Sequence, residues 1–346
     1  MRIFIRNALR MAVGARNYAR LQQIADNWRA ARVVRKLYKY DADRLLKFSG
    51  CYNGNSYGVA LADIIAACHV VEKGLTMPNR RFVFGRSAVC QLMDKIDGFE
   101  RKYGTSNEQV LHAANVVAEY YGMHNSLEHE DGESVLDEDF RSRLAAFCGK
   151  HGKSGKIGQM QTTRDSFYKD RKSSFDRFAW ARHTLRHYSD KILTTERIEK
   201  AVELALSTPS ACNRQYCRVH VVTDPKDIGA ILDIQKGNRG FGHLANKLLV
   251  VTADLEGLLW ARERNDLYTN GGMFLMNLCY SLYYHEIAHC VLNWSKSPEE
   301  DMALRRIVKI KESETVIALL TCGETPEDFS VAPSPRKSLA DVLVLH

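Results

Sequence analysis

The spacing of apolar and polar residues changes about halfway along the chain. Up to about residue 125, long stretches contain no proline, and alanine, leucine, arginine and lysine are frequent. Apolar residues recur there three or four positions apart, the spacing of one helical face. We therefore expect residues 15–125 to be mostly helical. The clearest such face comprises Val59, Leu61, Ile64, Ile65, Cys68 and Val71.

From about residue 178, helical segments alternate with short β-branched runs. Thr194 or Thr195 can cap a helix that ends before Pro209. The pattern predicts an α+β fold, in which a small sheet is covered by helices and follows a mostly helical N-terminal region. Strands are expected over Arg218–Thr223, Leu248–Thr252 and Val316–Leu320, and a long helix over 272–289.

Two composition shifts suggest where domains meet. Residues 128–139 contain seven acidic residues, and the glycine- and lysine-rich stretch Gly149–Gly158 follows. Such stretches are typical of exposed linkers. We expect a helical module over 1–150, a linker over 151–177 and a second domain over 178–346.

The overall composition of the 346-residue chain is that of a globular protein, with 45% hydrophobic and 26% charged residues. No apolar run approaches the roughly 20 residues of a membrane-spanning helix. The nine cysteines are scattered and form no C-x-x-C pair. This argues against a disulfide framework or a cysteine-ligated zinc site, and for a reducing, cytoplasmic setting.

The positive charge is concentrated at the N-terminus. The formal net charge is +8, and residues 1–40 hold ten lysines and arginines but one acid, Asp26. Arg2, Arg6 and Arg10 repeat every four residues and indicate a basic helix. Residues 1–40 are expected to contact either an anionic membrane surface or a partner, or to pack on their own domain. A mitochondrial transit peptide, which is also rich in arginine and poor in acids, is a further alternative. Nucleic-acid binding is less favoured, because no signature of a nucleic-acid-binding fold accompanies the charge.

Three separated segments in the second half carry candidate chemistry. Arg182–Tyr188 (RHTLRHY) places two arginines and a hydroxyl within five residues, a set that suits a phosphate. Pro209–Gln215 (PSACNRQ) offers small and amide side chains, which can bond the polar edge of a flat heterocycle, although an ordinary turn has the same composition. Pro333–Lys337 (PSPRK) is rich in proline and is expected to be extended.

In this order and spacing, the three segments resemble the nitroreductase family of FMN-dependent oxidoreductases. The family pattern is R-x-S/T-x-R/K-x-F/Y, then P-S-x-x-N-x-Q one helix later, and an arginine near the C-terminus. The resemblance runs from Arg182 to the end of the chain, about 165 residues. It implies the family's fold, a homodimer with two FMN sites at the subunit interface, and hydride transfer from NAD(P)H through flavin N5 to an electron-poor small molecule.

The resemblance also implies roles for individual residues. The first motif would bind the FMN phosphate, together with Arg336, and its second arginine would reach the pyrimidine edge. The second motif would approach the flavin from the other subunit. The backbone of Leu292 and Asn293 would face flavin N5, so no side-chain acid or base is required. The implied cofactor-binding residues are Arg182, His183, Thr184, Arg186, Pro209, Ser210, Asn213, Asn238, Asn293 and Arg336.

The first half contains one recognisable segment. His69–Leu75 (HVVEKGL) resembles a module fused to nitroreductase-like domains encoded near bacterial polysaccharide genes, which implies a role in polysaccharide biosynthesis. His69 and Glu72 share a helical face there and form either a site or a satisfied surface pair.

A competing motif is His285–His289 (HEIAH), an H-E-x-x-H sequence. On a helix, His285 and His289 would bind zinc and Glu286 would act as a general base, as in a zinc-dependent hydrolase. No recognisable third-ligand motif follows, and the flavin-family pattern surrounds the segment, where the family has a glycine-rich turn. A third hypothesis is a non-catalytic flavin-binding protein that uses its basic N-terminus for docking.

Overall fold

The computed structural model describes residues 11, 14–48, 56–78, 83–104, 107–125, 127, 136–151 and 160–346. The chain divides into two compact units, 1–55 with 258–266, and 56–257 with 267–346. The basic repeat Arg2–Arg10 and most of the predicted acidic and glycine-rich stretches lie outside the described residues.

The first unit is built on one long helix, α2 (Ala15–Phe48), none of whose residues is buried. The short helix η4 (Ala261–Glu263) accompanies it. Arg264 Nε and Nη2 donate to the two carboxylate oxygens of Asp41 at 2.6 and 2.8 Å, a bidentate pair. Within the described part of the chain, no helix combines the length and the apolar character needed to cross a bilayer.

The second unit begins with a helical module. Ser56 caps α3, its hydroxyl accepting from the Val59 N–H at 3.2 Å. Apolar faces of the module's helices share one core, which includes Ile64 and Val71 of α3. The mostly helical character expected of this region is thus confirmed. Its helices are α3 (Tyr57–Leu75), α4 (Arg86–Tyr103), α5 (Glu108–Asn125) and α6 (Glu138–His151).

A four-stranded antiparallel sheet follows, in the order β2-β3-β5-β4. The three strands expected from β-branched runs are confirmed as β2, β3 and β5. Strand β4 forms an edge of the sheet, and its first two residues, Ala288 and His289, fall within the range expected to be helical. The strands are β2 (Cys217–Val222), β3 (Lys247–Asp254), β4 (Ala288–Asn293) and β5 (Glu314–Gly323).

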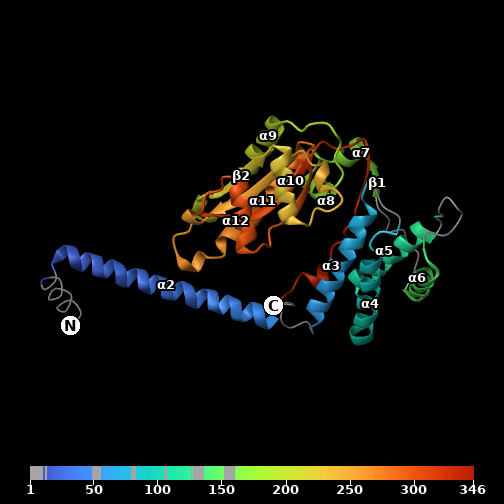
Figure 1. Cartoon of the computed structure of the whole chain (residues 1–346), viewed down its shortest axis with the longest axis horizontal. Coiled ribbons are helices and arrows are strands. Elements are labelled where there is room, and N and C mark those ends of the chain that lie inside the picture. The colour runs from blue at the N-terminus through green and yellow to red at the C-terminus, as the bar shows by residue number, and fades with distance from the viewer. Residues whose placement is uncertain are drawn as a thin grey trace. The chain divides into compact units, whose positions relative to one another are not determined.

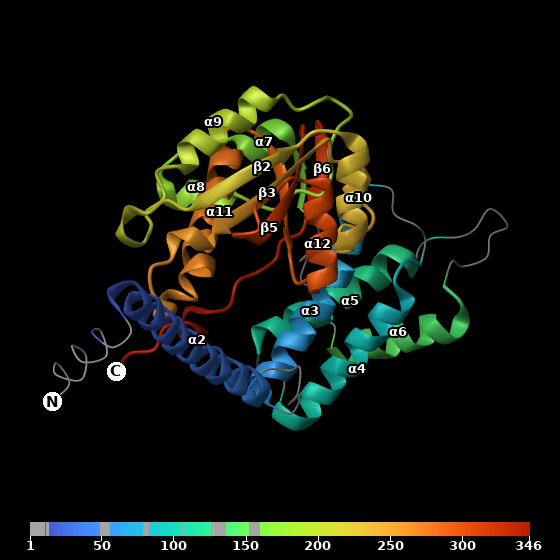
Figure 2. The same cartoon turned by 60° about the vertical axis from the view of Figure 1, so that its left-hand side comes forward.

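Helices cover both faces of this sheet, as Figure 2 shows. Alternate residues of β3 enter different cores: Leu248 and Val250 pack with α10 and α12, whereas Leu249 and Val251 pack with α9 and α11. This confirms the α+β prediction. The covering helices are α9 (Thr195–Ala205), α10 (Pro225–Gln235), α11 (Asp266–Tyr284) and α12 (Pro298–Ile307), with single turns at η1 (Ala211–Asn213), η2 (Gly242–Leu244), η3 (Leu255–Gly257) and η5 (Leu339–Asp341).

The segment expected to be a linker, 151–177, contains folded elements. Strand β1 (Met160–Thr163) pairs with β6 (Asp328–Val331), and α7 (Arg164–Tyr168) and α8 (Phe175–Ala181) follow. Phe167 and Tyr168 are buried against Tyr283 and other aromatic rings of the sheet domain. The sheet domain therefore begins earlier than expected, because these aromatic residues are part of its core. The polar and glycine-rich sequence before residue 160 gave no indication of this.

The helix expected over 272–289 ends at Tyr284. Glu286 has a φ of 57°, a left-handed conformation that does not continue a helix. Its carboxylate is held by Arg164 and Arg171, each at 2.7 Å. These distant ion pairs stabilise the turn that leads from α11, labelled in Figure 1, into β4.

Candidate functional site

The segment 182–188 is anchored beside β4 by its apolar and aromatic residues. Leu185 N donates to His289 O at 3.1 Å, and the buried Tyr188 hydroxyl lies 2.9 Å from Thr321 Oγ1. Because Leu185 and Tyr188 point into the core, the neighbouring residues Thr184 and Arg186 lie partly exposed. The predicted first motif is thereby presented along the edge strand of the sheet.

Two of the arginines expected at a phosphate gather around His183. Burial lowers the pKa of His183, and the nearby positive charges of Arg182 and Arg336 lower it further. The Nε of Arg182 is buried and has no partner among the described residues. A buried guanidinium with a free donor beside a second arginine fits an anionic group such as a phosphate.

Arg186 faces β4 and the helical module. Burial raises the pKa of the Cys290 thiol in β4, and the nearby Arg186 opposes this rise; the Arg186 Cζ lies 6.0 Å from the Phe241 ring centroid. The Arg186 Nη2 is 3.2 Å from Nε2 of His69 in α3. The arginine predicted at the pyrimidine edge therefore lies beside the strand that carries Leu292 and Asn293.

The loop after α10 is tied to the end of β4 through a buried glutamine. Gln235 Nε2 donates to Asn293 O at 3.2 Å, and its Oε1 accepts from Gly237 N at 2.7 Å and from Asn238 Nδ2 at 3.3 Å. Asn238 Nδ2 also donates to Leu232 O at 2.6 Å, so this amide closes the loop. Gln235 was not among the predicted site residues, although a polar residue on the apolar face formed by Ile228, Ile231 and Leu232 is a visible signal in the sequence.

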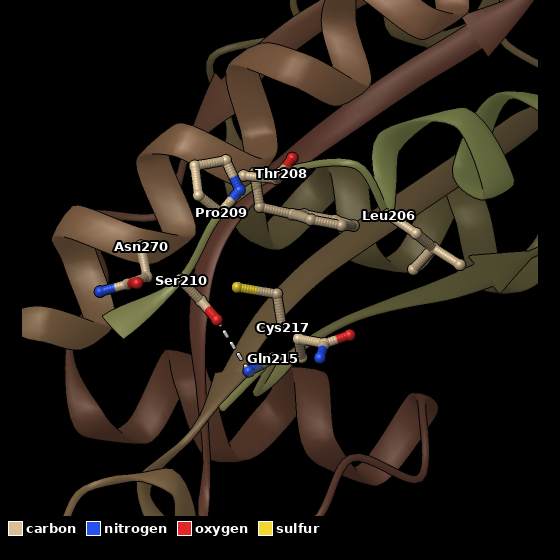
Figure 3. A pocket seen from close by; sticks show the side chains of 8 residues that line it. Leu206, Thr208, Pro209, Ser210, Gln215, Cys217 and Asn270 are labelled. Carbon is tan, nitrogen blue, oxygen red and sulfur yellow. Dashed lines mark hydrogen bonds between the residues drawn. The ribbon is translucent and has the colours of Figure 1, made fainter. Parts of the chain in front are cut away.

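The second motif forms a strained turn at a shallow pocket of about 40 Å³. Cys212, Asn213 and Gln215 have φ values of 51°, 53° and 49°, which non-glycine residues rarely adopt. The turn is held because Asn270 Oδ1 accepts from Ala211 N at 2.8 Å and Ser210 Oγ accepts from Gln215 N at 3.0 Å (Figure 3). Strain maintained in this way is a common property of ligand-binding loops.

The two motifs lie at opposite edges of the sheet. Pro209, Ser210 and Asn213 precede β2, one edge strand, whereas Arg186 and Asn293 lie at β4, the other edge strand. Three strand spacings correspond to about 14 Å. A single chain therefore brings the first motif, the Asn238 loop and Arg336 to one edge, and leaves the second motif at the other.

A cavity of about 170 Å³ lies between α3, α5 and the C-terminal tail. Ser334 of the tail donates its N–H to Glu72 Oε1 at 3.2 Å, and His112 Nε2 lies 3.2 Å from the same oxygen. Burial opposes ionisation of Glu72, but the hydrogen bonds from His112 and His69 outweigh it and lower the pKa of the carboxyl to about 2. Glu72 also pairs with His69, whose Nδ1 lies 3.8 Å from Glu72 Oε2, but Glu72 is only 5% exposed, so the pair is partly buried and is not the surface pair that the sequence also allowed.

The H-E-x-x-H segment does not form a zinc-peptidase helix. His285 follows the end of α11, whereas His289 is buried in β4, with Nδ1 2.9 Å from Ile287 O. The predicted alternative is therefore wrong, because the chain turns at Glu286 and separates the two imidazoles. Three metal-ligating side chains do meet elsewhere among the described residues, at Asp97, Glu100 and His151, but there the imidazole pairs with both carboxylates.

Residues 179–238 match the model of the nitroreductase family. A comparison with curated proteins finds no match. The matched residues include the first and second predicted motifs, which confirms the expected resemblance.

Solved structures give three further likenesses. An FMN-dependent nitroreductase from Clostridium difficile is 18% identical, with a TM-score of 0.39, and the match covers 48% of this chain and 92% of that one. A nitroreductase family protein from Clostridium difficile 630 is 19% identical, with a TM-score of 0.40, over 48% and 95%. A protein from Desulfovibrio desulfuricans in complex with FMN is 16% identical, with a TM-score of 0.41, over 51% and 98%.

Proposed function

We propose that this chain, whose residues 179–238 match the nitroreductase family, is an FMN-dependent oxidoreductase that passes hydride from NAD(P)H to an electron-poor small molecule. The observation that carries the proposal is the gathering of Arg182 and Arg336 around His183, with the buried Nε of Arg182 free to donate. Both arginines were assigned to the FMN phosphate by motif alone, and they come from segments more than 150 residues apart in sequence. Their convergence is expected of a phosphate site.

The residues of the first motif would bind and orient the cofactor. Arg182 and Arg336 would hold the phosphate by charge-assisted hydrogen bonds, and Thr184, which lies between the two arginines of the motif in sequence, would add a hydroxyl donor. Arg186 supplies a fixed positive charge at the pyrimidine edge. When bound, FMN supplies the redox chemistry by accepting and returning a hydride at N5.

Strand β4 would present backbone donors to the flavin. As an edge strand, β4 pairs on one side with β5 only, so alternate N–H groups face away from the sheet. Gln235 fixes the carbonyl of Asn293 and so orients the end of this strand. The backbone of Leu292 and Asn293 is the part of the strand proposed to face N5.

Pro209, Ser210 and Asn213 would complete the site from a second subunit. They lie about 14 Å away across the sheet in the same chain, which supports a homodimer with two equivalent sites at its interface. The resemblance of the helical module adds polysaccharide biosynthesis as the proposed context, in the cytoplasm with membrane-surface contact through residues 1–40.

Anaerobic titration of the purified protein with NADH and with NADPH tests the activity. The proposal expects bound FMN to lose its absorption near 450 nm within the time of mixing with one donor, and to regain it when a nitroaromatic acceptor is added. Bound FMN that neither nicotinamide reduces would favour the non-catalytic flavin-binding protein.

A further inference from the structure

Lys73 of α3 lies beside the proposed flavin site. Its Nζ donates to Gly237 O at 3.4 Å, next to Asn238 in the loop after α10. Burial lowers the pKa of Lys73, and the positive charges of Arg186 and Arg239 lower it further. A residue of the helical module thus enters a region formed by the nitroreductase-family segment.

Lys73, Arg186 and Arg239 form a cluster of three cations. Among the described residues, no carboxylate pairs with any of them. Other lysines of the helical module are paired: Lys95 with Asp63 and Lys150 with Asp97. Two unit charges 4 Å apart repel by about 4 kcal/mol near a protein surface, so an anion bound among these cations would relieve their mutual repulsion.

Lys73 lies on the face of α3 that contacts Arg186 through His69. His69 lies one helical turn before Lys73, and residues four apart point the same way. A guanidinium only donates, so His69 Nε2 accepts from Arg186 and the imidazole carries its proton on Nδ1. That Nδ1 lies 3.8 Å from Glu72 Oε2, which orients the ring. Glu72, His69 and Arg186 therefore form a connected row that fixes α3 against the site.

We propose that Lys73, Arg186 and Arg239 together bind the anionic pyrimidine ring of the reduced flavin, with Lys73 supplied by the helical module. The inference rests on the proposed function and extends it to a part of the chain outside the matched segment. A hydride delivers two electrons and one proton to N5, so the reduced ring keeps one negative charge, delocalised over N1 and O2. A third cation stabilises this form more than the neutral oxidised ring.

The test compares binding of oxidised and reduced FMN to Lys73 variants of the full chain. In Lys73→Met, affinity for reduced FMN is expected to fall about tenfold more than affinity for oxidised FMN, which lowers the two-electron potential by about 30 mV. Lys73→Arg keeps the charge and should retain the wild-type potential. Lys95→Met, in the same module but away from the site, is the matched control and should also keep it.

The outcomes separate the inference from the proposed function. If wild-type protein binds FMN and the potential of Lys73→Met equals that of the wild type, the inference is wrong and the proposed function stands. If wild-type protein binds no FMN, both are wrong. Arg239→Gln, at an exposed position that tolerates substitution, should shift the potential in the same direction. If circular dichroism shows that Lys73→Met does not fold, Arg239→Gln becomes the deciding variant. An unchanged potential in Arg239→Gln would then contradict the inference.

Discussion

Arg186 Nη2 lies 3.2 Å from His69 Nε2, and this contact joins two segments that are 117 positions apart. One is the segment matched to nitroreductases, and the other is the helical module. The module contacts the neighbouring loop through Lys73 and the C-terminal tail through Glu72. The helical module therefore forms one wall of the proposed flavin site, and its variants should affect the cofactor.

Replacing both Arg182 and Arg336 by alanine should abolish FMN retention. Each charge-assisted bond contributes about 1.5–3 kcal/mol, so the double variant should bind FMN at least a hundredfold more weakly, measured by quenching of flavin fluorescence. Arg177→Gln, at an exposed position of α8, is the control. A double variant that purifies with full FMN would contradict the assignment of the phosphate site.

Complementation between subunits should follow from the separation of the two motifs. Asn213→Ala and Arg182→Ala should each lower FMN content as single variants. A mixed dimer of the two contains one site with both wild-type residues, so random co-assembly should restore about a quarter of the sites. Recovery of FMN on co-expression of differently tagged chains measures this. No recovery in purified mixed dimers would show that both motifs act within one chain.

Glu72→Gln should reduce stability in a pH-dependent way. The pKa of Glu72 in the folded protein is about 2, below its ordinary 4.5, so the unfolded state binds the proton first. The stabilisation from Glu72 is full above pH 4.5 and is lost as the pH falls toward 2. At pH 7 the variant should lose about 1–3 kcal/mol, because His112 and Ser334 lose a charged acceptor. Urea unfolding at pH 7 and at pH 3 measures both values, and equal losses at the two pH values would refute this role.

Because of His289, the free energy of unfolding should begin to decrease at a higher pH than it does because of Glu72. Burial lowers the pKa of His289 from 6.5 to about 4, so between these values the unfolded state binds a proton that the folded state excludes. The free energy of unfolding should decrease from pH 6.5 to pH 4 by about 3 kcal/mol through this group. His289→Gln should flatten the profile in that range, as followed by thermal melting. A profile with the wild-type slope would place the titrating group elsewhere.

Local sequence signals were sufficient for much of the sheet domain. Helix α9 carries an apolar face and ends before Pro209, and β3 contains the run Leu248–Thr252, so both were predicted. Strand β4 was missed because Ala288 and His289 have weak strand character and the apolar spacing of α11 runs on toward them. The chain turns at Glu286 because Arg164 and Arg171, more than 110 positions away, hold its carboxylate, and such a long-range cause leaves no local pattern.

The candidate site divides in the same way. Arg182, Arg186 and Arg336 could be selected by motif, and the positive charges of Arg182 and Arg336 both lower the pKa of His183. Lys73 could not be selected from the sequence, because its proposed role depends on how α3 packs against a loop that lies 164 positions later in the chain.

An absorption spectrum of the freshly purified protein, with the released chromophore identified by mass, tests the central claim most directly. The account predicts a yellow protein with flavin bands that releases FMN, one per chain, which corresponds to two per homodimer. A colourless protein that also fails to bind added FMN would contradict it.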